Sequence, residues 1–265
     1  PASAILSGLV GSEMCIRDRL YSQNFSHDRI RERVIPAYMG LIKQIDDHLG
    51  RVMEKLRSME ILDSTLIIFT SDHGDYLGDH WLGEKDLFHE PSVRIPLIVY
   101  DPDKMAKESR GSLIEEFVEA VDILPTIIEF AGGTVCKQRV EGKSLLSFTR
   151  GIDRLENPRE YTISQIDYSD RGPRVSLNLH PYDCRAHMIR NYEWKYILHE
   201  KFPPQLYDMK NDPKELFDLG GYKEYASVKE EMHEILFTWF RNRLVRTEMD
   251  YDSLFEMGVN RDEKM

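Results

Sequence analysis

Residues 65–75, TLIIFTSDHGD, join a short apolar run to a polar loop. The run from Thr65 to Thr70 is continuous and rich in β-branched side chains, which is typical of a strand buried on both faces, as in a parallel sheet covered by helices. The loop that follows carries a carboxylate and an imidazole side by side, at Asp72 and His73. Ligands of open α/β sheets bind beyond the carboxyl ends of the strands. The stretch therefore predicts both a strand and the place of a functional site.

Helical and strand patterns flank this stretch in alternating order. Residues 36–59 repeat apolar side chains every three or four positions, which predicts an amphipathic helix with one buried stripe and with Pro36 in its first turn. Residues 94–100 predict a second strand, and residues 118–131 predict a helix that ends at a glycine pair. This order predicts an α/β fold with a partial doubly wound, mostly parallel sheet flanked by helices. The predicted stripe comprises Leu41, Ile42, Ile45, Leu49, Val52, Met53 and Leu56.

The pattern changes near residue 150. Short strands are predicted at 161–166, 186–190 and 194–199, and a helix from Lys223 to Arg246. We therefore expect residues 20–150 to belong to the main α/β domain and residues 151–265 to form a smaller α+β subdomain.

Composition narrows the classes of function. A net charge of −11 argues against a nucleic-acid partner, which selects for basic patches. No apolar run reaches the ~18 residues that a membrane span needs. The three cysteines, Cys15, Cys136 and Cys184, form no CxxC pair, so neither a disulfide framework nor a zinc cluster is expected.

Asp72 and His73 suit a divalent cation. The carboxylate offers a hard oxygen, the imidazole offers a borderline nitrogen, and Gly74 lets the chain turn away without crowding the ion. On these residues alone, a second interpretation stays open, in which Asp72 caps the next helix and His73 is an ordinary loop residue.

The loop continues with LGDHWLGEK at residues 77–85 and FHEPSVRIPLIV at residues 88–99. This segment resembles that of the sulfatase family, within the alkaline phosphatase superfamily, which has the form SDHGxxLGxHxxxxK followed by R-x-P-L-I. The resemblance is closest to the branch of phosphonate monoester hydrolases and arylsulfatase-like enzymes, and it spans most of Leu20–Met265. Further pieces match in the family's order: Ile45-Asp46-Asp47, Val121–Thr126, Glu141–Leu146, Met188–Arg190, Trp194–Tyr196, Leu206–Asp208 and Asn211–Pro213.

The resemblance implies roles for four residues. Asp72 and His73 correspond to the second pair of metal ligands, and Lys85 corresponds to a lysine that contacts a nonbridging oxygen of the bound sulfate or phosphate. Without the motif, Lys85 would be read as a solvated surface lysine. His80 has two open interpretations, assistance to the leaving group or hydrogen bonding within the loop. The implied metal is one divalent ion, calcium or manganese before zinc, and no organic cofactor site is implied.

The family's nucleophile is a formylglycine made from Cys or Ser in a Cys/Ser-x-Pro/Ala-x-Arg segment, and this chain has no such segment. We therefore expect the chain to be the carboxy-terminal part of a metal-dependent hydrolase of sulfate esters or of phosphate or phosphonate esters, and to be inactive by itself. The alternatives are a phosphatase or phosphoethanolamine transferase of the same superfamily, or a catalytically inactive binding relative. The expected partner is a small-molecule ester, with no nucleic acid and no membrane span, and a homo-oligomer is compatible with the sequence.

Residues 1–19 read differently from the rest of the chain. They show neither a helix cap nor a clear period, and no basic region precedes their apolar run, as it would in a signal peptide. Codons for residues 13–19, EMCIRDR, resemble a transposon-end sequencing adapter read in frame. We expect residues 1–19 to be non-native, with a divergent natural terminus as the alternative. The compartment, cytoplasm or periplasm, stays open.

Overall fold

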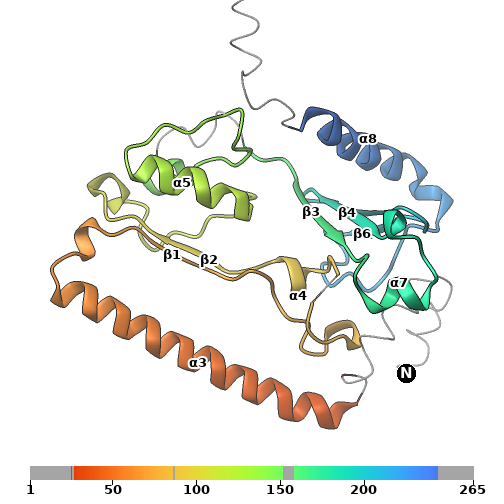
Figure 1. Ribbon diagram of the computed structural model, residues 1–265, viewed down its shortest axis with the longest axis horizontal. Helices are drawn as coiled ribbons and strands as arrows, with labels where there is room; N and C mark the ends of the chain where they lie inside the picture. The colour runs from red at the N-terminus through yellow and green to blue at the C-terminus, as the bar shows by residue number, and fades with distance from the viewer. Residues whose placement is uncertain (1–24, 26, 86, 152–157, 244–265) are drawn as a thin grey trace, which may run out of the picture. The chain divides into compact units, whose positions relative to one another are not determined.

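The computed structural model describes residues 25, 27–85, 87–151 and 158–243, and these contain both helices and strands (Figure 1). The prediction for residues 1–19 therefore lies outside the described residues. The α-helices are α3 (Asp28–Ser58), α4 (Glu90–Val93), α5 (Ile123–Phe130), α6 (Leu146–Arg150), α7 (Gly172–Ser176) and α8 (Ala226–Asn242). The strands are β1 (Ile67–Thr70), β2 (Leu97–Tyr100), β3 (Thr162–Asp167), β4 (Arg185–Arg190), β5 (Trp194–His199) and β6 (Gln205–Asp208). Short 3-10 helices are η1 (Leu62–Ser64), η2 (Asp79–Trp81), η3 (Lys104–Lys107), η4 (Ala120–Asp122), η5 (Pro181–Asp183) and η6 (Lys223–Tyr225).

The strands form two sheets, with β1 beside β2 in one and the order β3-β4-β5-β6 in the other. All three pairings of the larger sheet are antiparallel. The β4–β5 and β5–β6 connections are too short for the crossover that a parallel pair needs. The mixed class is confirmed, but the doubly wound, mostly parallel sheet is not. The described residues between 27 and 151 contain just two strands, which are too few to make such a sheet.

The chain divides into two compact units that interleave along the sequence. Within the described residues, one unit comprises 27–63, 68–98 and 160–234, and the other comprises 64–67, 99–151, 158–159 and 235–243. The single boundary near residue 150 stays a prediction. The first unit holds the predicted site loop together with the larger sheet.

Helix α3 is one 31-residue element (Figure 1). Asp28 in its first turn and Lys55 and Arg57 in its last turn complement the helix dipole. The expected helix is confirmed, but Pro36 lies in its interior rather than in its first turn, because helix-forming residues upstream extend the helix to Asp28. The expected burial of the apolar stripe is wrong for the described part of the chain, where α3 has no buried side chain. The sequence shows the helical period, but it does not show which surface would cover the apolar stripe.

Strands β1 and β2 are shorter than predicted. β2 begins after Pro96, which has no N–H to donate to a ladder. The expected burial on both faces is not observed, since the strand residues are partly buried or exposed and Ile98 is 60% exposed.

The larger sheet has two different faces. On one face, Met188 and Ile197 are cross-strand partners in a buried cluster with Tyr207 of β6 and Phe88 of the site loop. On the other face, the Tyr196 hydroxyl lies 3.1 Å from Nδ1 of His233 in α8, and burial raises the pKa of Tyr196 to about 12. The site loop therefore packs on a sheet whose opposite face contacts a helix.

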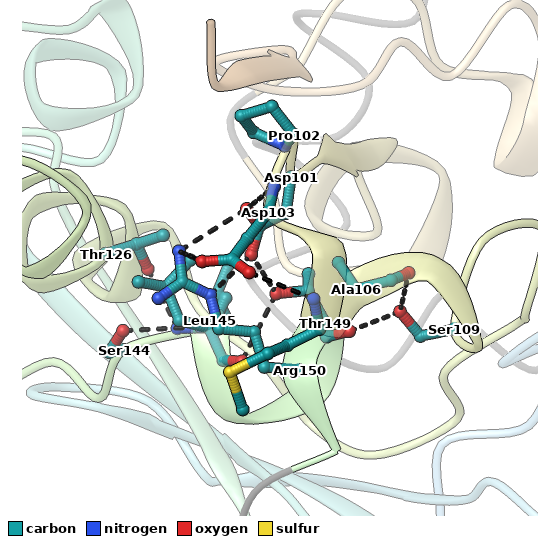
Figure 2. A network of polar contacts seen from close by, with 12 residues as sticks. Asp101, Pro102, Asp103, Ala106, Ser109, Thr126, Ser144, Leu145, Thr149 and Arg150 are labelled. Carbon is teal, nitrogen blue, oxygen red and sulfur yellow. Dashed lines mark hydrogen bonds and ion pairs between the residues drawn. The ribbon is translucent and has the colours of Figure 1, made fainter. Parts of the chain in front are cut away.

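In the second unit, a network of hydrogen bonds joins the end of β2 to α6. Asp101 is buried, and its Oδ2 accepts hydrogen bonds of 2.8 Å from Thr149 Oγ1 and from Arg150 Nε, as Figure 2 shows. Burial alone would raise the pKa of Asp101, but Arg150 and the hydrogen bonds hold it below its usual value. Asp122 has a similar structural role, because its carboxylate accepts from the backbone N–H groups of Glu119 and Lys143.

None of the described helices has the combination of length and apolar character that crossing a bilayer requires.

Candidate active site

The site loop leaves β1 at Ser71 and returns to β2 through α4. Gly74 fixes its first bend, because its N–H donates to the Ser92 carbonyl at 2.8 Å. A Cβ on Gly74 would lie 1.9 Å from the Pro91 carbonyl oxygen. The glycine therefore permits a close approach of two backbone segments, whereas the sequence suggested that it spares room for an ion.

Three of the four predicted site residues meet at the start of this loop. His73 Nε2 lies 3.3 Å from Asp72 Oδ2 and 2.8 Å from the Lys85 ammonium nitrogen. Asp72 is exposed, with 83% of its side chain accessible, while His73 and Lys85 are partly buried. The geometry thus joins neighbouring residues to a lysine that lies twelve positions further along the chain.

The hydrogen bonds of His73 determine which ring nitrogen is free to act as a ligand. Nδ1 lies 2.7 Å from the Gly74 carbonyl oxygen, which can only accept, so Nδ1 carries the proton in the neutral ring. Nε2 then carries the lone pair and accepts from Lys85 Nζ at 2.8 Å, while Asp72 Oδ2 lies 3.3 Å from it. This is the tautomer that a metal-ligating histidine needs, held by a backbone carbonyl.

Asp72 is anionic in this environment. Slight desolvation acts to raise the pKa of Asp72, but hydrogen bonds from its own backbone N–H and from that of His73 lower it, together with the charge of Lys85 and, when its ring is protonated, that of His73. A carboxylate and an imidazole lone pair that face one ammonium group form a donor pair for a cation. In the part of the chain that the structure describes, no cluster of three or more His, Cys, Asp or Glu residues could hold a metal ion. Asp72 and His73 can therefore supply two ligands of an incomplete set.

His80 has other neighbours. Its ring stacks on His89, with centroids 4.1 Å apart, and lies edge-on to Tyr76, whose hydroxyl is 2.9 Å from His89 Nδ1. Burial lowers the pKa of His80, against the opposing effects of Asp79, Asp212 and the Lys214 backbone. These contacts show that His80 packs against other rings of the loop. Hydrogen bonding of His80 within the loop, one of its two interpretations, stays a prediction, and so does its assistance to a leaving group.

The loop holds an unusual concentration of left-handed backbone. Leu77, His80, Trp81 and Glu84 have φ values of 47°, 52°, 59° and 60°. Each such residue is strained by roughly 1 kcal/mol or more, and strain of this kind gathers at functional sites. The loop therefore depends on contacts with the rest of the unit.

Some of these contacts come from residues that sequence reasoning did not assign to the site. Lys195, in the buried face of β5, and Glu215, beyond β6, both reach the segment that follows Lys85. The one available signal was a lysine at an inward position of an alternating strand, within the Trp194-Lys195-Tyr196 piece.

Comparison with known proteins agrees with the loop motif. Residues 15–133 match the family described as Sulfatase, and residues 78–242 match the family described as N-sulphoglucosamine sulphohydrolase, C-terminal. The chain belongs to the sulfatase family. This confirms the resemblance inferred from the sequence and places the chain within the alkaline phosphatase superfamily.

Relatives of this sulfatase-family chain include two curated proteins. It is 36% identical over 221 residues to the multifunctional alkaline phosphatase superfamily protein PehA of Trinickia caryophylli, covering 82% of this chain and 42% of PehA. It is 29% identical over 212 residues to an arylsulfatase of Clostridium perfringens, covering 80% of this chain and 41% of that one.

A solved structure of a hydrolase is also similar to this chain. The chain matches the phosphonate monoester hydrolase of Agrobacterium radiobacter with a TM-score of 0.70 and 32% identity, covering 76% of this chain and 40% of the hydrolase. The chain thus spans about two fifths of the length of these relatives.

Proposed function

We propose that the complete protein hydrolyses sulfate esters or phosphate or phosphonate esters, with Asp72 and His73 as two ligands of a divalent cation and Lys85 as an anion-binding residue. The observation that carries the proposal is the position of His73 Nε2, which lies 3.3 Å from Asp72 Oδ2 and 2.8 Å from Lys85 Nζ and is left unprotonated by the Nδ1 contact with the Gly74 carbonyl. The family assignment and the hydrolases among the relatives support it.

Each residue has a defined chemical task in this proposal. Asp72 supplies negative charge and a hard oxygen, and His73 supplies a nitrogen of fixed tautomer, a set that suits manganese or calcium and, less well, zinc. A cation held by Asp72 and His73 would supply Lewis-acid polarisation of an ester oxygen. Lys85 lies beside these ligands and neutralises charge on a nonbridging oxygen of the sulfuryl or phosphoryl group as the transition state forms.

The nucleophile that we propose is the hydrate of a formylglycine outside residues 27–243. One of its hydroxyls forms a bond to sulfur or phosphorus, while the bond to the ester oxygen breaks and the released alcohol takes up a proton. The second hydroxyl then collapses to the aldehyde and expels sulfate, phosphate or phosphonate. In the same proposal, β1 and β2 are two strands of a doubly wound sheet, most of which lies outside the described residues.

The substrate class is tested by assaying the complete protein that contains this chain on an aryl sulfate, an aryl phosphonate monoester and a phosphodiester. We expect hydrolysis of at least one of the three, loss of that activity on chelation, and recovery on adding Mn²⁺ or Ca²⁺. Lys85→Ala should lower kcat/KM about 100- to 1000-fold, as expected for loss of a charge-stabilising group.

The matched control for Lys85→Ala is Lys210→Ala, which removes an exposed lysine and should leave kcat/KM within twofold. Equal activity of Lys85→Ala and the wild-type protein, or activity that survives complete removal of divalent metal, would contradict the proposal.

A further inference from the structure

A buried group of four charged residues holds the segment that follows Lys85. Lys195 of β5 and Glu215 are both fully buried, and with Glu90 and Arg190 they combine two positive and two negative charges. These four residues, Glu90, Arg190, Lys195 and Glu215, are called the charge clamp below. They come from three parts of the chain, α4, the β4–β5 hairpin and the turn after β6, which all lie in one compact unit.

The ammonium group of Lys195 has three oxygen neighbours. Nζ donates to the Phe88 carbonyl at 2.8 Å and to Glu90 Oε1 at 2.9 Å, and it forms an ion pair with Glu215 Oε1 at 2.5 Å. Both hydrogen-bond acceptors of this ammonium group belong to residues 88–90. The Phe88 ring is inserted into the core of the same sheet face.

Glu215 contacts the main chain of the same segment. Its Oε2 accepts a 2.7 Å hydrogen bond from the Glu90 backbone N–H, at the start of α4. Burial raises the pKa of Glu215, and the neighbouring Lys195 acts to lower it. The residue also has a φ of 55°, a conformation that a glutamate adopts only where its surroundings enforce it.

The energetics of buried charge help to distinguish two roles of the charge clamp, stabilising the fold and fixing the main chain of residues 88–90. Replacing a buried ion pair by well-packed apolar residues is often neutral or stabilising, so a buried pair is weak evidence for a contribution to stability. Residues 88–90 are instead fixed at two points of their main chain, the Phe88 carbonyl and the Glu90 N–H. Lys85 lies three positions before the first of these points.

We propose that Lys195 and Glu215 are positioning residues, which set the main chain of residues 88–90 and thereby hold Lys85 against His73. This proposal rests on the proposed function, because it requires that Lys85 acts on the substrate. A misplacement of about 1 Å can reduce a rate about 100-fold, so loss of the charge clamp acts on kcat even while the fold persists.

The first test compares two variants of the complete protein. Lys195→Met leaves two buried carboxylates without their lysine, and should lose both stability and about 100-fold in kcat. The double variant Lys195→Met/Glu215→Leu removes the fully buried pair and should recover stability. We expect its kcat to stay low, because the Phe88 carbonyl and the Glu90 N–H have lost their partners. Recovery of kcat together with stability would overturn the proposal and leave the charge clamp a purely structural feature.

The second test asks whether Lys195 acts through Lys85. In the Lys85→Ala background, Lys195→Met should cause no further loss of kcat beyond about twofold. An unchanged 100-fold loss in that background would show that Lys195 acts by another route. Full activity of Lys85→Ala by itself would instead contradict the proposed function, so the two failures are distinguishable.

A third measurement does not depend on activity. Hydrogen exchange of residues 87–93 should become at least tenfold faster in the double variant, while residues 194–199 exchange at the wild-type rate. Lys210→Met, an exposed lysine of the same unit, should change neither segment. Unchanged protection of residues 87–93 in the double variant would overturn the proposal.

Discussion

Helix α3 and the four-stranded sheet belong to the same compact unit, yet they differ in how their apolar residues are used. The sheet buries Met188, Ile197 and Leu206 almost completely. The helix, by contrast, is about 46 Å long by its helical rise, and its apolar stripe is exposed or only partly buried in the described part of the chain. The difference teaches that amphipathic periodicity identifies an element without showing that its partner is present.

The sheet should show the largest stability effects. Leu206 is fully buried in β6, so Leu206→Ala should cost about 2–5 kcal/mol through lost burial and the cavity that remains. The loss in free energy of unfolding is measured by urea denaturation, with hydrogen exchange of residues 185–199 as the probe of the sheet. Leu113→Ala, at an 85% exposed leucine, is the control and should change stability by less than about 0.5 kcal/mol. Equal costs for the two variants would show that the sheet core is not packed as described.

A smaller change in stability is expected when the pH is lowered, because His80 then gains a proton. Burial holds the pKa of His80 below its usual value of about 6.5, so the folded state binds fewer protons there than the unfolded state. The stability that depends on neutral His80 is therefore complete above pH 6.5 and decreases as the pH falls below it.

The matched variant for this pH effect is His80→Asn, because asparagine tolerates the left-handed backbone of that position. The variant should flatten the stability profile of the site loop between about pH 5 and 7, relative to that of the wild-type chain. An identical profile for both proteins would contradict the assignment of this titration to His80.

The smallest effect is expected on α3. Ile45→Ala should change the stability of the 265-residue chain by less than about 0.5 kcal/mol, because the side chain is half exposed. In the complete protein, the same substitution should cost about 2–4 kcal/mol if another part of the polypeptide covers the stripe. Chemical denaturation of both proteins makes the comparison. Equal small costs in both would show that the stripe stays uncovered.

Features that depend on neighbouring residues were predicted from the sequence, and features that depend on distant residues were not. Strands β3, β4 and β5 were predicted because their alternation is local, and α5 because Gly132 marks its end. β6 was missed, since four residues after a proline pair give too short a pattern. Neither the exposure of the α3 stripe nor the strand order could be read locally, because both depend on distant partners.

The candidate site also combines contacts between neighbouring residues, which were predictable, with contacts between distant residues, which were not. Asp72 and His73 are neighbours in sequence, so their pairing was predictable, and Lys85 was found through the family motif. The grip of Lys195 and Glu215 on residues 88–90 joins positions more than a hundred residues apart. The inward position of Lys195 in its strand is a local signal of an unusual residue, but it does not identify the segment that Lys195 contacts.

The account depends most directly on the tautomer of His73. Long-range ¹H–¹⁵N correlation of the histidine rings at pH 7.5, with His73→Gln to assign the signal, reports which nitrogen carries the proton. We predict a proton on Nδ1, and a shift of the Nε2 signal when Zn²⁺ or Ca²⁺ is added, which Asp72→Asn weakens. A proton on Nε2, with no response to either ion, would contradict the proposal that His73 and Asp72 hold the cation.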